Sequence, residues 1–314
     1  MKIRILGSES LGVRGLSCVV ETGQRKIVID PGVALGYRRH GLLPHPFQVA
    51  VGIEVRRKIV KALEDCTDIV ISHFHGDHIP LANANPYQLS ARVVSHSFQK
   101  PRLWCKSPND VSPSMAKRCR DLSEVLGRRL PCSEGQTSGL LSFSQSMPHG
   151  EAKGPLGGVM MTRVEDTKDI FVHASDIQLL DFTPLEQILA WKPDIVLASG
   201  PPLYLRHLSS RTRKSARENA LFLAKRVPIL ILDHHILRNE EGYRFLEDLS
   251  VSVGHTVFCA ADYMGRRRLP LEAWRQRLYW EMPVPEGWHK AYSQGRVDTD
   301  SYRKWRGIRI QDII

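Results

Sequence analysis

The sequence predicts a mixed α/β (α+β) protein built from two similar β-rich halves. Two short apolar runs, residues 69–71 and 229–232, have the composition of strands that are buried on both faces. Each run follows a helical pattern, over residues 53–65 and 211–226, and each is followed by histidines. The hydrophobic share of 42% and the charged share of 25% are ordinary for a globular protein. We therefore treat residues 1–314 as one large domain of two or four layers.

Membrane, secretion and disulfide signals are not found in the sequence. No apolar run approaches the ~20 residues that a membrane-spanning helix needs, so we expect no membrane partner. Residues 2–6 alternate as a strand does and lack the apolar core of a signal peptide. The six cysteines are scattered without a Cys-x-x-Cys pair, which is typical of a reducing compartment. We expect a cytoplasmic protein.

The chain is strongly basic, with a net charge of +11. This excess favours a small or large partner that bears phosphate groups, nucleic acid included, because positive charge attracts such ligands over long distances. A charged, solvated surface suited to a hot or salty cell is the alternative explanation. Charge alone does not choose between them.

The first strands lead to a turn of interest. We expect strands over residues 2–6, 17–21 and 26–30. The third closes with Asp30-Pro31-Gly32, which is either a simple turn or part of a site. Residues 33–52 break the pattern, and we expect a long loop there, near the mouth of a site. An amphipathic helix over residues 53–65 then leads into the strand at 69–71.

A dense group of metal-binding side chains follows that strand. Within six positions stand His73, His75, Asp77 and His78. Imidazole and carboxylate groups suit Zn²⁺, iron or Mn²⁺, and Gly76 gives the backbone freedom to turn between them. A polar turn that happens to be rich in histidine is the alternative, but packing does not explain such a cluster at a strand end. The pattern predicts a metal site at the edge of a sheet.

Two segments are expected to stand outside the main pattern. Residues 97–135, with a basic helix over 117–130, form a candidate insertion that lines the site or presents a solvated face. Residues 263–314 form a C-terminal extension rich in arginine, tryptophan and tyrosine. The extension is either a basic, aromatic binding surface or a helix and tail that pack on the sheet.

Two further strand ends carry residues of interest. The strand at 140–144 leads to His149, and the second arm of a hairpin, 170–174, ends at Asp176. Helix 183–191 and strand 195–199 follow.

The strand at 229–232 ends in the pair His234 and His235. Matching this end to Ile71-Ser72-His73 favours His234 as a ligand. Adjacent residues of a strand point to opposite faces, so both histidines cannot serve if the strand continues. His235 stays open as a ligand or a substrate contact, and His255 is a more distant rival.

The run His73-Phe74-His75-Gly76-Asp77-His78 resembles the His-x-His-x-Asp-His motif of the metallo-β-lactamase-fold hydrolases. Residues 12–17, 30–35 and 232–238 look most like a group of predicted metal-dependent hydrolases within this superfamily. The resemblance implies a four-layer αββα sandwich, with two mixed sheets face to face and helices outside. It also implies that Asp30 supports the metal loop by hydrogen bonds rather than binding metal. The implied ligands are His73, His75 and His149 for a first ion, Asp77, His78 and His234 for a second, and Asp176 as the bridge.

The implied activity is hydrolysis by a hydroxide bound to two divalent metal ions. Zinc is the first expectation, with iron or manganese as alternatives. Asp77 would orient the nucleophile or carry its proton, and His235 is the second candidate for a catalytic role. A phosphodiester-type substrate is favoured by the charge, and a lactone, thioester or other small ester is the alternative.

The segment between Asp176 and His234 has no room for the inserted domain of large nucleic-acid-processing members, which disfavours a nuclease. Two functions other than hydrolysis stay open. An iron-dependent redox role uses the same ligand set, but no flavodoxin-like extension follows. A basic nucleic-acid-binding protein with a retained structural metal is the non-catalytic alternative. The ligand set contains no cysteine, which favours catalysis because structural zinc sites are usually rich in thiolates.

Overall fold

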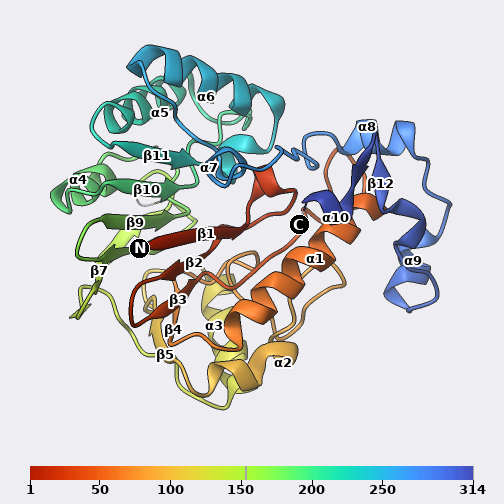
Figure 1. Ribbon diagram of the computed structural model, residues 1–314, viewed down its shortest axis with the longest axis horizontal. Coiled ribbons are helices and arrows are strands. Elements are labelled where there is room, and N and C mark those ends of the chain that lie inside the picture. Colours follow the sequence, from red (N-terminus) through yellow and green to blue (C-terminus); the bar gives the residue numbers. More distant parts are fainter. Residues whose placement is uncertain (153, 314) are drawn as a thin grey trace.

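The computed structural model describes residues 1–152 and 154–313, which form two β-sheets between outer layers of helices (Figure 1). The first sheet has five strands in sequential order. They are β1 (Lys2–Gly7), β2 (Ser17–Glu21), β3 (Lys26–Ile29), β4 (Asp68–Ile71) and β5 (Arg102–Cys105). Strands β1 to β3 pair antiparallel, and β4 and β5 then add in parallel.

The second sheet repeats this arrangement in the order β11-β10-β9-β8-β7-β6. Its strands are β6 (Thr137–Ser138), β7 (Leu141–Pro148), β8 (Gly158–Glu165), β9 (Ile170–Ser175), β10 (Ile195–Ala198) and β11 (Ile229–Leu232). Strands β7 to β9 are antiparallel, and β10 and β11 continue in parallel. The prediction of two similar halves is confirmed. In the second sheet, the strand at the place of β4 is β10, and β11 takes the place of β5.

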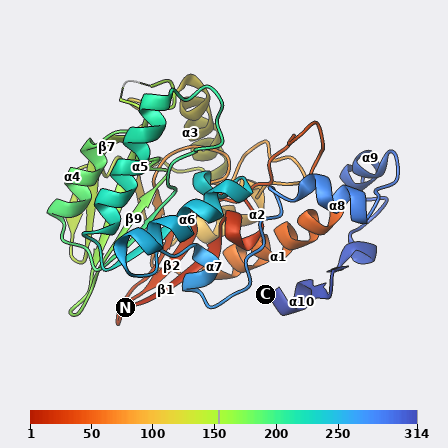
Figure 2. The ribbon, with the colours of Figure 1, turned by 90° about the horizontal axis from the view of Figure 1, so that it is seen from above.

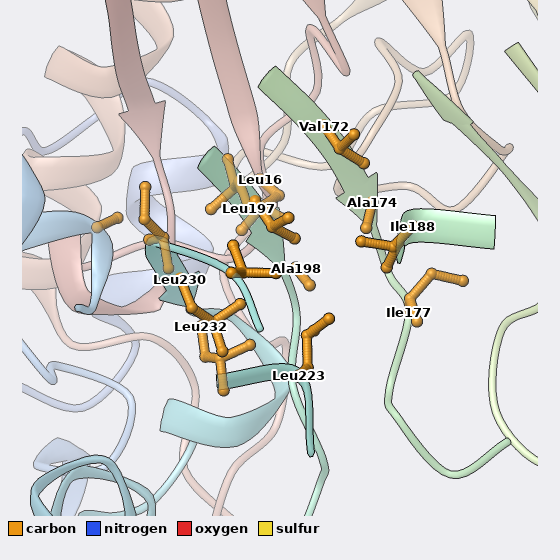
Figure 3. Close-up of a cluster of buried hydrophobic side chains, with 14 of the residues drawn as sticks. Leu16, Val172, Ala174, Ile177, Ile188, Leu197, Ala198, Leu223, Leu230 and Leu232 are labelled. Carbon is orange, nitrogen blue, oxygen red and sulfur yellow. The ribbon is translucent and has the colours of Figure 1, made fainter. Parts of the chain in front are cut away.

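The sheets face each other across one apolar core and meet helices on their outer sides. Alternate residues of a strand point to opposite faces, so Cys18 and Val20 join the core between the sheets while Val19 packs under the helices. Figure 3 shows both faces of the second sheet, where Leu197 lies beside Leu16 on the inner side and Ala174 lies beside Ile188 of an outer helix. This αββα order is the predicted four-layer sandwich.

The helices of each outer layer come from the same half of the chain as the sheet they cover. Helices α1 (Pro46–Leu63), α2 (Ala91–Val94) and α3 (Pro113–Leu126) cover the first sheet. Helices α4 (Thr183–Ala190), α5 (Ser210–Ala224) and α6 (Glu240–Val253) cover the second. None of the described helices is long and apolar enough to cross a membrane.

Helix α1 corrects the prediction of a long loop over residues 33–52. It begins at Pro46, where His45 Nδ1 accepts a hydrogen bond from the Phe47 amide at 3.1 Å, and the Gln48 side chain accepts one from the His45 amide at 3.2 Å. Proline in the first turn suits a helix start because its missing N–H would have no partner there. Only residues 33–45 remain as a connection.

Residues 97–135 and 263–314, the predicted insertion and extension, occupy different positions in the fold. Residues 97–135 supply strand β5 at the edge of the first sheet and helix α3 in its outer layer. The C-terminal segment packs against α1 rather than on a sheet, as the two views show (Figures 1 and 2), and the rings of Phe47 and Trp305 lie 5.9 Å apart. Its elements are α8 (Arg275–Glu281), α9 (Trp288–Ser293), β12 (Lys304–Trp305), β13 (Ile308–Arg309) and α10 (Ile310–Ile313). The short α7 (Ala260–Tyr263) precedes them and packs beside β11.

Strand direction brings the predicted site residues to one edge. Strands β3 and β4 are parallel, so Asp30 and the motif that begins at His73 follow neighbouring strand ends. Strands β7, β9 and β11 also run in one direction, because β7 and β9 both oppose β8 and the others are parallel. The turns after these strands carry the remaining candidates.

Substitution of Gly32 tests how tightly the turns after β3 and β4 pack against each other. A Cβ atom at this position would lie 2.2 Å from the backbone of His78 and Ile79. We expect Gly32→Ala to lower the free energy of unfolding by about 3 kcal/mol, since backbone atoms cannot move aside. Gly23→Ala is the matched control, because nothing lies within 4 Å of its added methyl group. Urea unfolding that gives equal stabilities for the two variants would contradict this packing.

Candidate metal centre

Three imidazoles surround one oxygen of Asp176. Asp176 Oδ2 lies 3.3 Å from His149 Nε2, 3.5 Å from His73 Nε2 and 3.9 Å from His75 Nδ1. Two ligands that each lie ~2.1 Å from a tetrahedral ion are about 3.4 Å apart. The spacing of these four groups therefore fits one metal ion.

A second cluster surrounds the other oxygen. Asp176 Oδ1 lies 3.1 Å from His78 Nε2 and 3.5 Å from His234 Nε2. The same nitrogen of His234 lies 3.5 Å from Asp77 Oδ2. Asp77, His78 and His234 thus form a separate group of ligand atoms close enough to hold one ion. Asp176 stands between the two clusters with one oxygen toward each.

Three polar atoms at the centre lack hydrogen-bond partners among the described residues. His78 Nε2, His149 Nε2 and Asp176 Oδ1 are buried and make no hydrogen bond with the described residues. Leaving a buried polar atom unpaired costs about 1–3 kcal/mol. Divalent metal ions would satisfy these atoms, and the residues present therefore fit such ions.

Asp30 supports this centre by hydrogen bonds to His78 and to two neighbouring serines. Its Oδ2 accepts hydrogen bonds from His78 Nδ1 at 2.9 Å and from the Ser72 and Ser175 hydroxyls at 2.7 and 2.6 Å. Burial by itself raises the pKa of Asp30, but the hydrogen bond and positive charge of His78 outweigh it and hold the pKa below its ordinary range. An ionised Asp30 fixes the imidazole so that Nε2 of His78 faces Asp176.

The turn after β11 brings both adjacent histidines to the centre. The strand ends at Leu232, and His234 adopts a φ of 87°, which is rare for a residue other than glycine. Asp233 holds this turn, since its Oδ1 accepts hydrogen bonds from the amides of His234 and Ser10 at 2.6 and 3.1 Å. His235 Nε2 consequently lies 3.2 Å from Asp176 Oδ2. The strand does not continue, so the opposite-faces rule does not separate the pair.

His255 lies elsewhere. Its side chain is exposed, and its Nε2 lies 3.1 Å from the Ala224 carbonyl oxygen, at the end of α5. The structure does not bring it to the centre.

Sequence reasoning missed an ion pair beside the second cluster. Arg238 Nε donates to Glu9 Oε1 at 2.9 Å, and Arg238 Nη2 lies 3.0 Å from His234 Nε2 and 3.7 Å from Asp77 Oδ2. Burial and the nearby Glu272 carboxylate raise the pKa of Glu9 to about 8. Glu9 follows β1 and Arg238 lies three residues after His235, so their positions at strand ends were the available signal.

A cavity of about 490 Å³ opens onto these residues. His235, Arg238 and Gln178 supply polar groups on one side, and Tyr204 stands at its margin. Its other walls are largely apolar and include Leu156, Leu180, Leu205 and Leu208. A substrate could therefore reach the two clusters from this side.

The family comparisons agree with this geometry. Residues 12–98 match the family model of the metallo-beta-lactamase superfamily, a span that includes the motif at His73 to His78. A solved metal-dependent hydrolase of the beta-lactamase superfamily has a TM-score of 0.48 and 11% identity to this chain, over 82% of this chain and 94% of its own. Residues 12–98 are thus similar to the metallo-β-lactamase superfamily.

Longer matches give the particular family. A UPF0282 protein of Methanosarcina mazei is 52% identical over 302 residues, covering 96% of this chain and 99% of its own length. A second, from Pyrococcus furiosus, is 33% identical and covers 89% of this chain and 92% of its own. The chain belongs to the UPF0282 family. Together, the superfamily fold and the histidine and aspartate clusters indicate a divalent metal site.

The hydrogen bond between Asp30 and His78 leads to a testable prediction. We expect Asp30→Asn to weaken zinc binding by about 10–100-fold, because an amide holds the His78 imidazole less well than a carboxylate. Isothermal titration of the chelator-treated protein measures the affinity. Asp68→Asn is the matched control, since Asp68 is also buried in the first sheet but pairs with Arg25 and Trp104. Equal zinc affinity in both variants would show that Asp30 has only a structural role.

Proposed function

We propose that this protein is a hydrolase that uses two divalent metal ions to cleave a phosphate-bearing, phosphodiester-type substrate. Asp176 carries the most weight, because its two oxygens face two separate clusters of buried imidazoles. A carboxylate in that position is suited to hold two ions close together. When bound, such ions lower the pKa of a water molecule toward neutrality and stabilise negative charge that develops on the substrate.

The donor set favours zinc, with iron or manganese as the alternatives. Imidazole nitrogens and carboxylate oxygens bind all three metals, and the absence of thiolates from the proposed set is typical of catalytic rather than structural zinc sites. The proposed ligands are His73, His75, His149, Asp77, His78, His234 and Asp176.

Asp77 and His235 are the residues we propose for moving protons. Burial raises the pKa of Asp77, but the charges of His78 and His234 lower it more, so this carboxylate is an ionised acceptor. Burial and the positive charge of Arg238 lower the pKa of His235 to about 3. His235 is therefore neutral near pH 7, and its Nε2–H is a donor on the side where it faces the ionised Asp176 carboxylate.

Arg238 favours a phosphate substrate over a neutral one. Its guanidinium is buried beside His234 and also lines the cavity. A guanidinium stays charged at all working pH values, and its fork of N–H groups matches the oxygens of a phosphate. The net charge of +11 adds a long-range attraction for such substrates.

Hydrolysis of an ester, lactone or thioester is the second candidate. The leucines that line the cavity favour it, because an apolar acyl chain would bury its surface there. The two candidates differ in what they require of Arg238.

Replacing the bridging carboxylate tests the hydrolase proposal. We expect Asp176→Ala to lose at least one of two equivalents of zinc, iron or manganese in elemental analysis. Its kcat/KM for bis-p-nitrophenyl phosphate should fall more than about a hundredfold, since even indirect metal supports cost 10–100-fold. Asp248→Ala, at an exposed carboxylate on α6, is the control and should match the wild type. Wild-type protein that binds no metal, and stays inactive with added Zn²⁺ or Mn²⁺, would refute the proposal.

A double variant separates phosphate from acyl chemistry. Arg238→Met removes the guanidinium, and Glu9→Gln replaces its carboxyl partner, so no buried carboxylate is left unpaired. We expect kcat/KM for a phosphodiester to fall by about tenfold or more, while that for a neutral chromogenic ester changes by less than about threefold. Steady-state kinetics on both substrates measures the ratio. A wild type that prefers the ester, with the phosphodiester unaffected in the variant, would favour the second candidate.

A further inference from the structure

A second hollow lies next to the metal cavity and is strongly basic. It has a volume of about 870 Å³ and is bounded by the segment before α5, the start of α6 and helix α8. Five arginines and two glutamates line it, which leaves an excess of positive charge. We call this hollow the basic groove; its arginines are Arg39, Arg206, Arg213, Arg244 and Arg277.

Most of this charge is not neutralised by the protein. Within residues 1–152 and 154–313, Arg277 is the one groove arginine that pairs with a carboxylate, at 3.4 Å from Glu240 Oε1. Arg213 donates to backbone carbonyls, including Leu208 O at 3.2 Å, and so keeps its full charge. Arg206 and Arg244 are exposed and have no acidic partner within 4 Å among the described residues. Such uncompensated guanidinium groups are an electrostatic site for anions.

Tyr204 joins the basic groove to the metal cavity, because it lines both. Its hydroxyl lies 3.4 Å from Arg238 Nη1, and the guanidinium of Arg39 lies 5.0 Å from the centre of its ring. Arg39 also donates to the Arg238 carbonyl at 2.7 Å. One chain of contacts therefore runs from the metal clusters through Arg238 and Tyr204 into the groove.

We propose that the basic groove binds a phosphate-bearing part of the substrate that does not react, while the bond to be cleaved lies at the metal clusters. This assignment of the ligand as substrate rests on the proposed hydrolase function. Anion binding by the groove is a separate property of its arginines. The substrate class is thus a molecule with at least one further phosphate beyond the reacting one.

The side chains of the groove fit a phosphate-bearing ligand better than a neutral one. Arginine forks bind phosphate oxygens in pairs, and aromatic rings such as that of Trp274 add flat surface for a base or sugar. A volume of this size accommodates a ligand of small-molecule dimensions. An oligonucleotide end and an inorganic polyphosphate chain share this chemistry, and the experiment includes both.

The test is a binding measurement on full-length protein stripped of metal with a chelator. The probes are inorganic triphosphate, followed by calorimetry, and a fluorescein-labelled single-stranded hexanucleotide, followed by anisotropy. The groove variant is Arg206→Glu with Arg244→Glu. The control variant is Arg92→Glu with Arg129→Glu, which changes the net charge equally at exposed arginines of the opposite outer layer.

We expect the wild type to bind at least one probe, with affinity that falls as salt rises. The groove variant should bind that probe about tenfold or more weakly, and the control variant within about threefold of the wild type. The probe that binds identifies the source of the phosphates. Equal losses in the two variants, or no binding of either probe by a folded wild type, would overturn the proposal.

Activity toward a small substrate separates this inference from the hydrolase proposal. Bis-p-nitrophenyl phosphate has a single phosphate, so it offers the groove no further phosphate when that one lies at the metal clusters. The groove variant should therefore retain wild-type kcat/KM for this substrate. Groove-dependent binding in a protein without hydrolase activity would refute the hydrolase proposal and leave the anion site standing.

Discussion

The Asp176 carboxylate is the group around which the centre is arranged. It is almost fully buried, and imidazoles from three different turns surround its two oxygens. Burying a carboxylate is costly unless partners compensate its charge. Burial raises its pKa, but the surrounding histidines outweigh this effect and keep the pKa well below the ordinary value. The end of β9 must therefore face the end of β4, and this requirement holds the two sheets in register.

Other buried charges support that arrangement from outside the ligand set. Asp30 ties the turn after β3 to His78, and Asp233 ties the turn after β11 to the loop after β1. Both Asp30 and His234 have positive φ values, and strained residues of this kind persist only where neighbouring contacts fix them. The strain and the compensating hydrogen bonds occur at the same strand ends. Backbone strain therefore occurs next to the candidate metal ligands.

Much of the fold and of the centre could be predicted because a strand and the residues that follow it can be recognised from a short stretch of sequence. A β-branched run followed by His73, or a longer strand followed by His149, is visible without knowledge of tertiary contacts. The pairing of Glu9 with Arg238 and of Asp233 with Ser10 is not visible in this way, because each pair joins loops more than two hundred residues apart. The start of α1 was missed for a related reason. Its first two turns are buried all round under the C-terminal segment, so they show no amphipathic pattern.

The C-terminal segment has two roles that its composition alone did not separate. Trp288 and Trp305 are buried against the first sheet's helical layer, as expected of a packing role. Trp274 and Arg277 instead line the basic groove beside Tyr204. A surface rich in arginine therefore lies within reach of the metal centre only because α8 is anchored by those tryptophans. Packing in one part of the segment therefore fixes the position of charged side chains in another, next to the cavity at the candidate metal centre.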